Sequence, residues 1–385
     1  MELTPRWLVA RRDDATAAAI LATIDRGPAV ALLHPGLADS ERNALQQRID
    51  LTALPADAAV VIFTSGSTGA AKGVVLSARA FAASAAAHAA NLPWRAGDRW
   101  LCCLSLAHIG GLSIVTRCAA AGRDAVLATE APFDPAKLAA TIAAERITLL
   151  SVVPAMLARL IDELPAWRAP AHLRAVLVGG ARAGQDLVAR ARERGVPVLT
   201  TYGMTETCSQ IYTGGKLLFG VELRTVDGRL QVRGPMLAEG YIDQDGFRPL
   251  TGADGWFDTG DLGHLDDRGG LHVVGRADDC IISGGANVAP AEVERALQTC
   301  PDVRAACVFG VPDPVWGQLV AAAIVPATAD DGATHERLAA FVRDHLASYK
   351  RPRRVCLVDA LPRGLSGKID RGRAAALTRD HLRPW

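Results

Sequence analysis

The sequence predicts an α/β fold with a large N-terminal domain, whose sheets are mostly parallel, and a small α+β C-terminal domain. The first observation is that short apolar runs alternate with helix-like stretches as far as about residue 215, an order typical of parallel sheets covered by helices. The second is that strands become short and are interrupted by Gly and Asp after that point, which indicates a small β-barrel-like part. The third is a compact segment of about a hundred residues that ends the chain, a normal size for a domain.

The elements of the large domain follow from local patterns. The Ala-rich stretch 78–90 predicts a helix, because Ala is the best helix former and Phe81, Ala85 and His88 stand at helical spacing. A short apolar run and a Gly-rich loop precede it, so we expect the order strand, loop, helix. Strands are expected at 59–63, 99–104, 125–128, 148–153, 174–178 and 197–201, and further helices at 135–145 and 183–194.

The later elements divide into two groups. Short strands at 221–226, 229–234 and 271–275 form the small antiparallel or barrel-like part. The last segment is expected to contain a helix at 291–298, strands at 305–311 and 320–325, a helix at 336–347 and a strand at 354–358. The charged pair Asp278-Asp279 lies between the groups, so we predict domains at 1–277 and 278–385.

Composition excludes several classes of function. Lys and Arg number 42 against 41 Asp and Glu, so no net charge draws the chain to nucleic acid or to an anionic membrane. No apolar run approaches the ~18 residues of a membrane helix, and charged residues at 11–14 interrupt the place where a signal peptide needs its apolar core. The eight cysteines form no C-x-x-C pair, which disfavours a metal cage and favours a reducing cytoplasm.

The first motif is the Gly- and hydroxyl-rich stretch FTSGSTGAAKGV at residues 63–74. It is not a Walker A motif, because Gly73 rather than Ser or Thr follows Lys72. Gly66 and Gly69 allow close approach of the backbone, successive N–H groups can form an anion nest, and Lys72 adds a positive charge. The stretch is either a phosphate-binding loop or a flexible surface turn; the strand before it and the lysine after it favour phosphate.

Two further motifs supply groups that suit a nucleotide. The stretch TTYGMTETCSQ at 200–210 contains Tyr202, which can stack on a base, and Glu206, a carboxylate of the kind that Mg²⁺ prefers. By itself it is equally well a buried tyrosine and a helix cap. The stretch WFDTGDLG at 256–263 places Asp261 between glycines, where its carboxylate can accept from two ribose hydroxyls or serve as an ordinary turn residue.

Two motifs in the C-terminal region complete the pattern: GRADDCIISGGANVAPAEVE at 275–294 and LPRGLSGKIDR at 361–371. The five motifs in this order closely resemble the adenylate-forming superfamily of acyl- and aryl-CoA ligases, firefly-type luciferases and peptide-synthetase adenylation domains. The resemblance extends from about residue 58 to about residue 372. It implies an enzyme that uses ATP and Mg²⁺ to activate a carboxylic acid as an acyl-adenylate, after which coenzyme A takes the acyl group as a thioester. It also implies that the C-terminal domain is mobile, with a hinge at Asp278.

The resemblance assigns roles to individual residues. Tyr202, followed by Gly203, would stack on adenine, Thr205 would contact the α-phosphate, and Glu206 would bind Mg²⁺. The turn at the adenine edge would be Gly179, Gly180 and Ala181. The pyrophosphate loop would consist of Thr64, Ser65, Gly66, Ser67, Thr68, Gly69 and Lys72. Asp261 would hold the ribose with Arg276 beside it, and Lys368 would bridge the carboxylate and the α-phosphate. The loop formed by Ser283, Gly284 and Gly285 would line the pantetheine channel after a domain rotation.

A finer resemblance concerns the acid. The stretches WLCCLSLAHIGGLSIVTR, TYGMTETCSQI and ISGGANVAPAEVE are similar to the o-succinylbenzoate–CoA ligases of menaquinone biosynthesis. That resemblance implies that His108 lines the acyl pocket, although a lone histidine is more often a satisfied core residue. The second carboxylate of such a substrate needs a cation or hydroxyls, for which Arg159, Ser209 and Thr213 are candidates; Arg159 is equally well a solvent-facing helix residue.

The sequence also departs from the family. The phosphate loop normally lies well over a hundred residues into the chain but begins here at residue 64, so we expect a shortened N-terminal region, which leaves a homodimer as one possible state. A bulky aromatic residue usually precedes the pocket histidine, whereas this chain has Ala107. The alternatives are a ligase for a benzoate-type or medium-chain acid, transfer to a carrier protein, and a nucleotide-binding paralogue without catalysis.

Overall fold

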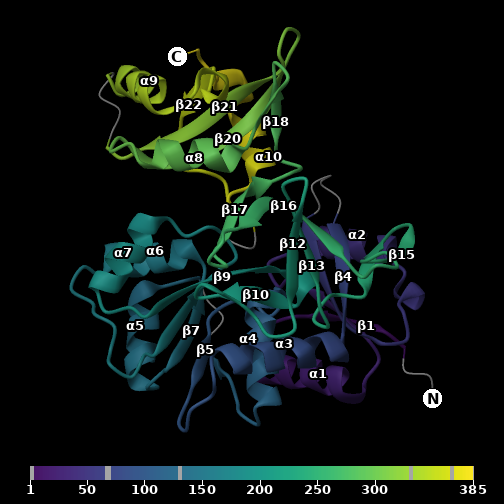
Figure 1. Cartoon of the computed structure of the whole chain (residues 1–385). Helices are drawn as coiled ribbons and strands as arrows, with labels where there is room; N and C mark the ends of the chain where they lie inside the picture. The colour runs from purple at the N-terminus through teal and green to yellow at the C-terminus, as the bar shows by residue number, and fades with distance from the viewer. Residues whose placement is uncertain (1–3, 66–70, 129–131, 329–332, 365–367, 385) are drawn as a thin grey trace. The chain divides into compact units, whose positions relative to one another are not determined.

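A computed structural model describes residues 4–65, 71–128, 132–328, 333–364 and 368–384. Residues group into two compact units, one made of 1–223, 231–257 and 267–270, and the other of 224–230, 258–266 and 271–385. The first unit contains two large sheets with helices, and the second contains the C-terminal sheet with its helices (Figure 1). The domain boundary at Asp278 stays a prediction.

The first sheet of unit 1 has the strand order β1-β2-β3-β4-β14-β15. Its strands are β1 (Arg6–Val9), β2 (Val30–Leu33), β3 (Ala58–Ser65), β4 (Ala71–Ser77), β14 (Gly240–Asp243) and β15 (Gly246–Pro249), and α1 (Asp14–Arg26), α2 (Asp39–Arg48) and the short helix η1 (Leu51–Ala53) connect the first three. Pairing is parallel from β1 to β3 and antiparallel from β3 onward. The sequence patterns predict no element before residue 58, so β1, β2, α1 and α2 are additions to the expected fold.

The strand β4 corrects the expected order of elements. We expected strand, Gly-rich loop and helix, but the loop joins two antiparallel strands, and α3 (Ala78–Asn91) begins only after the second of them. Thr64 on β3 and Lys72 on β4 are Cα partners in this hairpin. The lysine is therefore fixed by strand register instead of standing at the start of a helix.

The second sheet has the strand order β11-β10-β9-β8-β7-β5-β6, parallel except for the pairs formed by β10 and β11. Its strands are β5 (Trp100–Cys102), β6 (Val126–Leu127), β7 (Leu149–Val152), β8 (Ala175–Val178), β9 (Val198–Met204), β10 (Ser209–Thr213) and β11 (Lys216–Leu217). Its helices are α4 (Ile109–Ala120), α5 (Pro135–Ala144), α6 (Pro154–Glu163), α7 (Gln185–Glu193) and the one-turn η2 (Thr205–Thr207). The mostly parallel α/β prediction is thereby confirmed.

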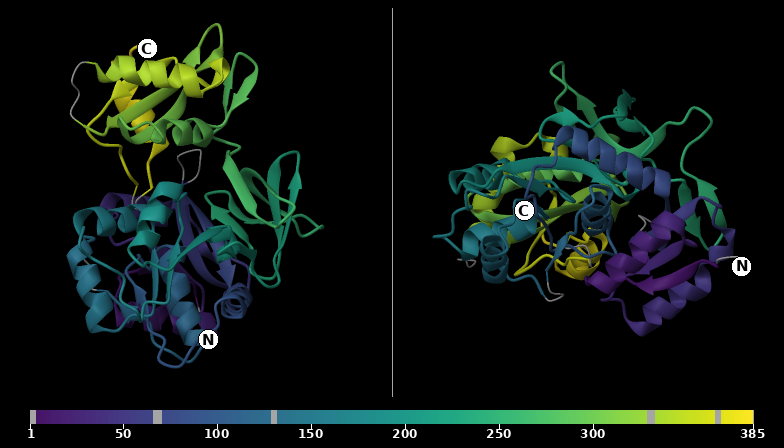
Figure 2. Two further views of the ribbon diagram at one scale, coloured as in Figure 1. Left: turned by 60° about the vertical axis from the view of Figure 1, so that its left-hand side comes forward. Right: turned by 90° about the horizontal axis from the view of Figure 1, so that it is seen from below.

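Both faces of this second sheet are covered, as Figure 2 shows from two sides. Successive residues of a strand point to opposite faces, so Leu149 packs into the core with α3 and α4, whereas Leu150 packs into the core with α5 to α7. Helices α3 and α5 begin at polar caps: Ser77 accepts from the N–H of Ala80 at 3.2 Å, and Asp134 accepts from the N–H of Ala136 at 2.9 Å. Burial on both faces explains why the strands read as nearly continuous apolar runs.

A third sheet has the order β12-β13-β16-β17, all of them short or irregular strands: β12 (Glu222–Val226), β13 (Arg229–Arg233), β16 (Phe257–Leu265) and β17 (Leu271–Arg276). The C-terminal sheet contains β18 (Ile281–Ser283), β19 (Ala286–Val288), β20 (Val303–Asp313), β21 (Gly317–Pro326) and β22 (Arg354–Leu357). Its helices are α8 (Pro290–Gln298), α9 (Thr334–His345), α10 (Arg371–Thr378), η3 (Ser348–Lys350) and η4 (Arg379–His381). These strands and helices make the C-terminal segment α+β, as the sequence predicts.

Candidate active site

The hairpin of β3 and β4 carries the first group of predicted site residues. The hydroxyl oxygen of Thr64 is buried and has no hydrogen-bond partner among the described residues. An unsatisfied buried hydroxyl next to a lysine suits an anionic ligand, because burying such a group without a partner is unfavourable. Ser65 ends β3; Gly66, Ser67, Thr68 and Gly69 lie outside the described residues.

Lys72, Glu206 and Tyr241 form a close group in unit 1. The Nζ atom of Lys72 lies 3.7 Å from Oε1 of Glu206 and 3.8 Å from the centre of the Tyr241 ring. The hydroxyl of Tyr241 donates to the same Oε1 at 2.9 Å. The structure thus brings together two residues that the sequence placed at the phosphates and at Mg²⁺, and it adds a tyrosine that the motifs did not indicate.

The predicted adenine-edge turn follows strand β8. A Cβ atom on Gly179 would collide with the hydroxyl of Thr201 on β9, and Gly180 has φ +77°, which favours glycine. Ala181 follows in the same turn. The turn lies at the carboxyl end of a parallel strand, the edge at which ligands bind in open α/β sheets.

Tyr202, Gly203 and Thr205 lie where β9 leads into η2. Tyr202 is half-buried and packs against the core, and Gly203 lies so close to the carbonyl of Ser209 that a Cβ atom would collide with it. The carbonyl of Thr205 accepts from the N–H of Cys208, which adopts φ +48°. This turn holds Tyr202 and Glu206 on one short segment.

A buried polar cluster lies between α3, α4 and β10, and its central residue is not among those predicted from the sequence. Arg117 on α4 is 2% exposed; its Nη1 donates to Oε1 of Gln210 at 2.9 Å and its Nη2 donates to Oγ of Ser84 at 2.9 Å. Gln210 in turn donates to Nδ1 of His88 at 3.1 Å. The sequence signal was an arginine inside the otherwise apolar helix IGGLSIVTRCAA.

The electrostatics of this cluster are unusual. Among the described residues no carboxylate pairs with Arg117, and its Nε is buried without a partner. Burial lowers the pKa of Arg117 to about 10, which leaves the guanidinium charged at neutral pH. Burial, and then the positive charge of Arg117, hold the pKa of His88 well below its usual value, so His88 is neutral. Within the described part of the chain, the cluster therefore carries one buried positive charge that lacks a counterion.

The three candidates for the second carboxylate are placed differently. Ser209 and Thr213 are buried on β10; the hydroxyl of Ser209 donates to Ser113 at 3.2 Å, and that of Thr213 has no partner among the described residues. Arg159 lies on α6, 47% exposed, and its Nε donates to Glu163 at 2.6 Å. The structure brings Ser209 and Thr213 into the strand that carries Gln210 but gives Arg159 a surface partner instead.

His108 is the N-terminal cap residue of α4, the helix that carries Arg117. Its ring centre lies 5.2 Å from that of His34. The preceding Ala107 is buried in the core of unit 1.

Asp261 and Arg276 belong to unit 2 and pair across β16 and β17. Nη1 of Arg276 lies 3.2 Å from Oδ1 of Asp261, and its Nη2 lies 3.4 Å from Oδ2 of Asp278. Burial by itself would lower the pKa of Arg276, but the neighbouring carboxylates of Asp261 and Asp278 outweigh it and raise that pKa. The predicted ribose carboxylate is thus fixed by the arginine that the sequence placed beside it, and the predicted hinge residue joins the same ion-pair group.

The remaining predicted residues also lie in unit 2. Ser283 ends β18, and Gly284 and Gly285 form the turn to β19 with φ +57° and +81°. A Cβ atom on Gly284 would collide with the ring of Trp316. Lys368 is exposed, and its carbonyl accepts from the N–H of Gly364 at 2.9 Å.

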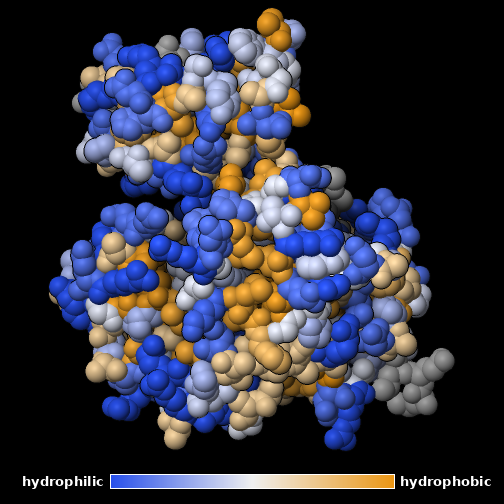
Figure 3. Space-filling model, in the orientation of Figure 1, coloured by the Kyte–Doolittle hydropathy of each residue, from blue (hydrophilic) through white to orange (hydrophobic). Residues whose placement is uncertain are grey.

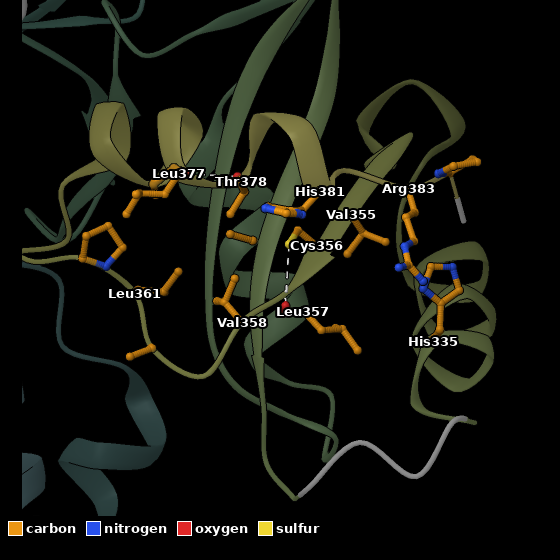
Figure 4. Close-up of a pocket in the computed structure, with 15 residues that line it drawn as sticks. His335, Val355, Cys356, Leu357, Val358, Leu361, Leu377, Thr378, His381 and Arg383 are labelled. Atoms are coloured by element: carbon orange, nitrogen blue, oxygen red, sulfur yellow. Dashed lines mark hydrogen bonds between the residues drawn. The ribbon is translucent and has the colours of Figure 1, made fainter.

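A cavity of about 770 Å³ also lies in unit 2 (Figure 4). Leu361, Thr378 and His381 line it, together with Cys356 on β22, whose thiol donates to the carbonyl of Leu357 at 3.6 Å. None of the residues predicted from the sequence lines this cavity. Volume alone therefore does not locate the predicted site.

The donor set fits a magnesium nucleotide. Lysine and hydroxyl groups suit phosphate, and a single carboxylate suits Mg²⁺, which keeps water and phosphate oxygens as its other ligands. No group of three or more His, Cys, Asp or Glu side chains in the described part of the chain could hold a metal. None of the helices described is long and apolar enough to span a bilayer.

Two family models match the chain. One is described as AMP-binding enzyme and covers residues 9–242; the other is described as AMP-binding enzyme C-terminal domain and covers residues 292–368. Together they contain most of the predicted site, although Asp261, Arg276, Asp278 and the loop 283–285 lie between the two matched ranges.

Named relatives and solved structures agree with these models. The chain is 37% identical over 351 residues to the 2-succinylbenzoate–CoA ligase of Bacillus cereus, covering 86% of this chain and 71% of the relative. It is 39% identical over 337 residues to the enzyme of the same name from Bacillus licheniformis, covering 82% and 69%. It also resembles the o-succinylbenzoate CoA synthetase of Bacillus subtilis in complex with the acyl-adenylate intermediate OSB-AMP, with a TM-score of 0.81, 31% identity, and coverage of 96% and 87%. The same synthetase in complex with ATP and magnesium ion gives a TM-score of 0.82, 31% identity, and coverage of 96% and 89%.

Proposed function

The chain belongs to the AMP-binding enzyme family, the adenylate-forming superfamily, and from this premise we propose that it ligates 2-succinylbenzoate to coenzyme A. It is an AMP-forming acid–CoA ligase that uses ATP, Mg²⁺ and coenzyme A. A carboxylate oxygen of the acid attacks the α-phosphorus of ATP, and pyrophosphate leaves. The thiol of coenzyme A then attacks the acyl carbon, loses its proton, and AMP leaves.

The chain's own residues position the reactants in this proposal. Thr64 and Lys72 contact the β- and γ-phosphates, Tyr202 stacks on adenine beside Gly179 to Ala181, and Thr205 contacts the α-phosphate. Asp261 accepts from the ribose hydroxyls, and Lys368 donates to the carboxylate and the α-phosphate during adenylation. Bound Mg²⁺, held through Glu206, would neutralise charge on the triphosphate. We also keep the hinge at Asp278 and the domain boundary beside it as proposals.

The observation that carries the choice of acid is the buried charge of Arg117. 2-Succinylbenzoate retains one carboxylate after the other is activated, and that carboxylate needs a positive charge in the acyl pocket. The buried guanidinium of Arg117, for which the described residues supply no counterion, is our candidate for this charge; it donates to Gln210, on the strand that also carries Ser209 and Thr213. This replaces Arg159 as our first candidate, since Arg159 is on the surface and paired with Glu163.

The test is pyrophosphate release with ATP and Mg²⁺ against 2-succinylbenzoate, benzoate, 4-phenylbutyrate and octanoate, with and without coenzyme A. We expect preference for the diacid and thioester only when coenzyme A is present. Arg117→Lys should raise KM for the diacid while KM for 4-phenylbutyrate changes little, and Arg159→Gln serves as the matched surface control. Preference for a monoacid would remove the role of Arg117 but keep the ligase.

Two other results would point elsewhere. Adenylate formation without transfer to coenzyme A would favour a carrier protein as the acceptor. ATP binding without pyrophosphate release across the panel would favour the non-catalytic paralogue.

Two finer expectations belong to the same proposal. We propose that two copies of the chain pair through a hydrophobic face of unit 1 near β10, which Figure 3 displays. Phe219, in the connection between β11 and β12, is 74% exposed. Light scattering of the wild type and of Phe219→Ser tests the pairing.

We also propose a reducing cytoplasm as the compartment, because all eight cysteines are free thiols. Fractionation of cells tests this location.

A further inference from the structure

Tyr241 contacts both charged residues that the proposed function places at the phosphates. Its hydroxyl donates to Oε1 of Glu206 at 2.9 Å, and its ring lies 3.8 Å from Nζ of Lys72. Both contacts lie inside unit 1. One side chain therefore touches the carboxylate with its polar end and the ammonium with its ring face.

The positions of the three residues follow from the sheets. Lys72 on β4 and Tyr241 on β14 lie on neighbouring antiparallel strands, in which Tyr241 is the Cα partner of Val74. Residues two apart on a strand point to the same face, so the side chains of Lys72 and Tyr241 are diagonal neighbours. Glu206 lies on η2, which connects β9 and β10 of the second sheet. Its carbonyl accepts from the N–H of Ala238 at 2.8 Å, close to the start of β14. Tyr241 thus joins the two sheets at the point where the predicted phosphate site lies.

The start of β14 is itself firmly held. Glu239 accepts from the hydroxyl of Ser77 at 2.6 Å and from Nη2 of Arg79 at 2.8 Å. The next residue pairs with β4, because Gly240 is the Cα partner of Val75. A tyrosine on such a rigid strand can fix the orientation of a carboxylate on a short turn.

We infer that Tyr241 is a positioning residue for the magnesium nucleotide. Its hydroxyl fixes the Glu206 carboxylate, and its ring face holds the Lys72 ammonium at the phosphate position before ATP arrives. When the triphosphate binds, the ammonium exchanges Glu206 for phosphate oxygens, while the hydroxyl keeps the carboxylate oriented. The inference rests on the proposed function for the nature of the ligand.

The two contacts can be separated by substitution. Tyr241→Phe removes the hydroxyl and keeps the ring, whereas Tyr241→Leu removes both. Tyr212→Phe is the matched control, because the hydroxyl of Tyr212 on β10 in the same unit donates to a backbone carbonyl, that of Gly269, at 3.1 Å. Circular dichroism and urea unfolding establish that each variant is folded.

The readout is ATP affinity by titration calorimetry without the acid, so that no turnover occurs, once with Mg²⁺ and once with EDTA. In Tyr241→Phe we expect ATP affinity with Mg²⁺ to fall roughly tenfold and affinity in EDTA to stay unchanged, since a hydrogen bond to a charged group is lost only from the carboxylate. Tyr241→Leu should also lose affinity in EDTA, because the cation–π contact to Lys72 is gone. Tyr212→Phe should match the wild type in both conditions.

A double-mutant comparison decides whether Tyr241 acts through Glu206. In a Glu206→Gln background, Tyr241→Phe should cause no further loss of affinity with Mg²⁺. Equal losses with and without Mg²⁺ in Tyr241→Phe, or a full further loss in the Glu206→Gln background, would overturn the inference. Failure of the proposed function is distinguished by the acid panel, because these titrations need only ATP and Mg²⁺.

Discussion

Asp261 and Arg276 are Cα partners on β16 and β17, and Nη1 of the arginine lies 3.2 Å from Oδ1 of the aspartate. The Asp261 side chain is only 10% exposed, so its carboxylate is oriented before any ligand arrives. Pre-orientation of this kind suits a group that must accept from two neighbouring hydroxyls.

Asp261→Asn should weaken ATP binding by about 10–100-fold, because the amide keeps one acceptor oxygen and the variant loses one hydrogen bond to a charged acceptor, which contributes roughly 1.5–3 kcal/mol. Titration calorimetry measures it. Asp258→Asn is the matched control on the same strand; Asp258 pairs with Arg229. Equal effects of the two substitutions would show that loss of a sheet ion pair, and not loss of a ribose contact, is responsible.

Lys368→Ala should reduce pyrophosphate release in the presence of acid by roughly 100–1,000-fold, since a positive charge at the reacting phosphate is removed. The affinity for ATP should change less than about threefold, because the proposed role of the lysine is in the transition state. The exposed Lys216 on β11 supplies the control, Lys216→Ala. Unchanged adenylate formation would remove the assigned role.

His88 predicts a pH dependence of stability. Its pKa in the folded chain is lowered by burial and by Arg117, so between that value and the unfolded value near 6.5 the unfolded chain binds more protons. The stabilisation that comes from keeping His88 neutral is complete above about pH 6.5. It declines as pH falls, so the free energy of unfolding decreases by at most about 1.4 kcal/mol per pH unit. The free energy of unfolding in urea should therefore fall between pH 7 and pH 5.

His88→Gln should flatten this slope, whereas substitution of the exposed His381 should not. A slope in His88→Gln equal to that of the wild type would mean that other groups cause the pH dependence.

Gly203→Ala should destabilise unit 1 by about 1–3 kcal/mol, because the new methyl group collides with the carbonyl of Ser209 and the Cα of Gln210. Urea unfolding measures the loss. Gly184→Ala is the control, since a Cβ atom there meets nothing within 4 Å. ATP binding by Gly203→Ala should weaken as well, because Tyr202 is its chain neighbour; a variant as stable as the wild type would contradict the close contact.

Much of the fold could be predicted from sequence where a signal is local. The Ala-rich run predicted α3 almost to the residue, and the apolar run before Gly179 predicted β8. Strand β4 was missed because Gly73 interrupts it and the helix follows directly. That glycine is a packing requirement: a Cβ atom would collide with Val61 and Ile242 on the neighbouring strands, and no local pattern reports such a contact.

The candidate site shows the same difference between residues with a local sequence signal and residues without one. Lys72 and Glu206 were found because each lies within a contiguous motif. Arg117 and Tyr241 were missed because their roles depend on partners that are 93 and 35 residues away in sequence, and these meet only when helices and sheets pack. Arg159 had the correct charge, but its helix places that charge on the surface.

The role proposed for Arg117 in substrate selectivity conflicts with optimisation of thermostability. Replacing a buried charge and its polar neighbours by apolar side chains of similar volume is often neutral or stabilises a protein by roughly 1–4 kcal/mol. A redesign of α3, α4 and β10 that optimises packing alone would therefore remove Arg117 together with Ser84 and Gln210. Engineering of a heat-resistant variant should hold these three residues fixed and seek its gains elsewhere, on the solvent-facing helices α5 to α7.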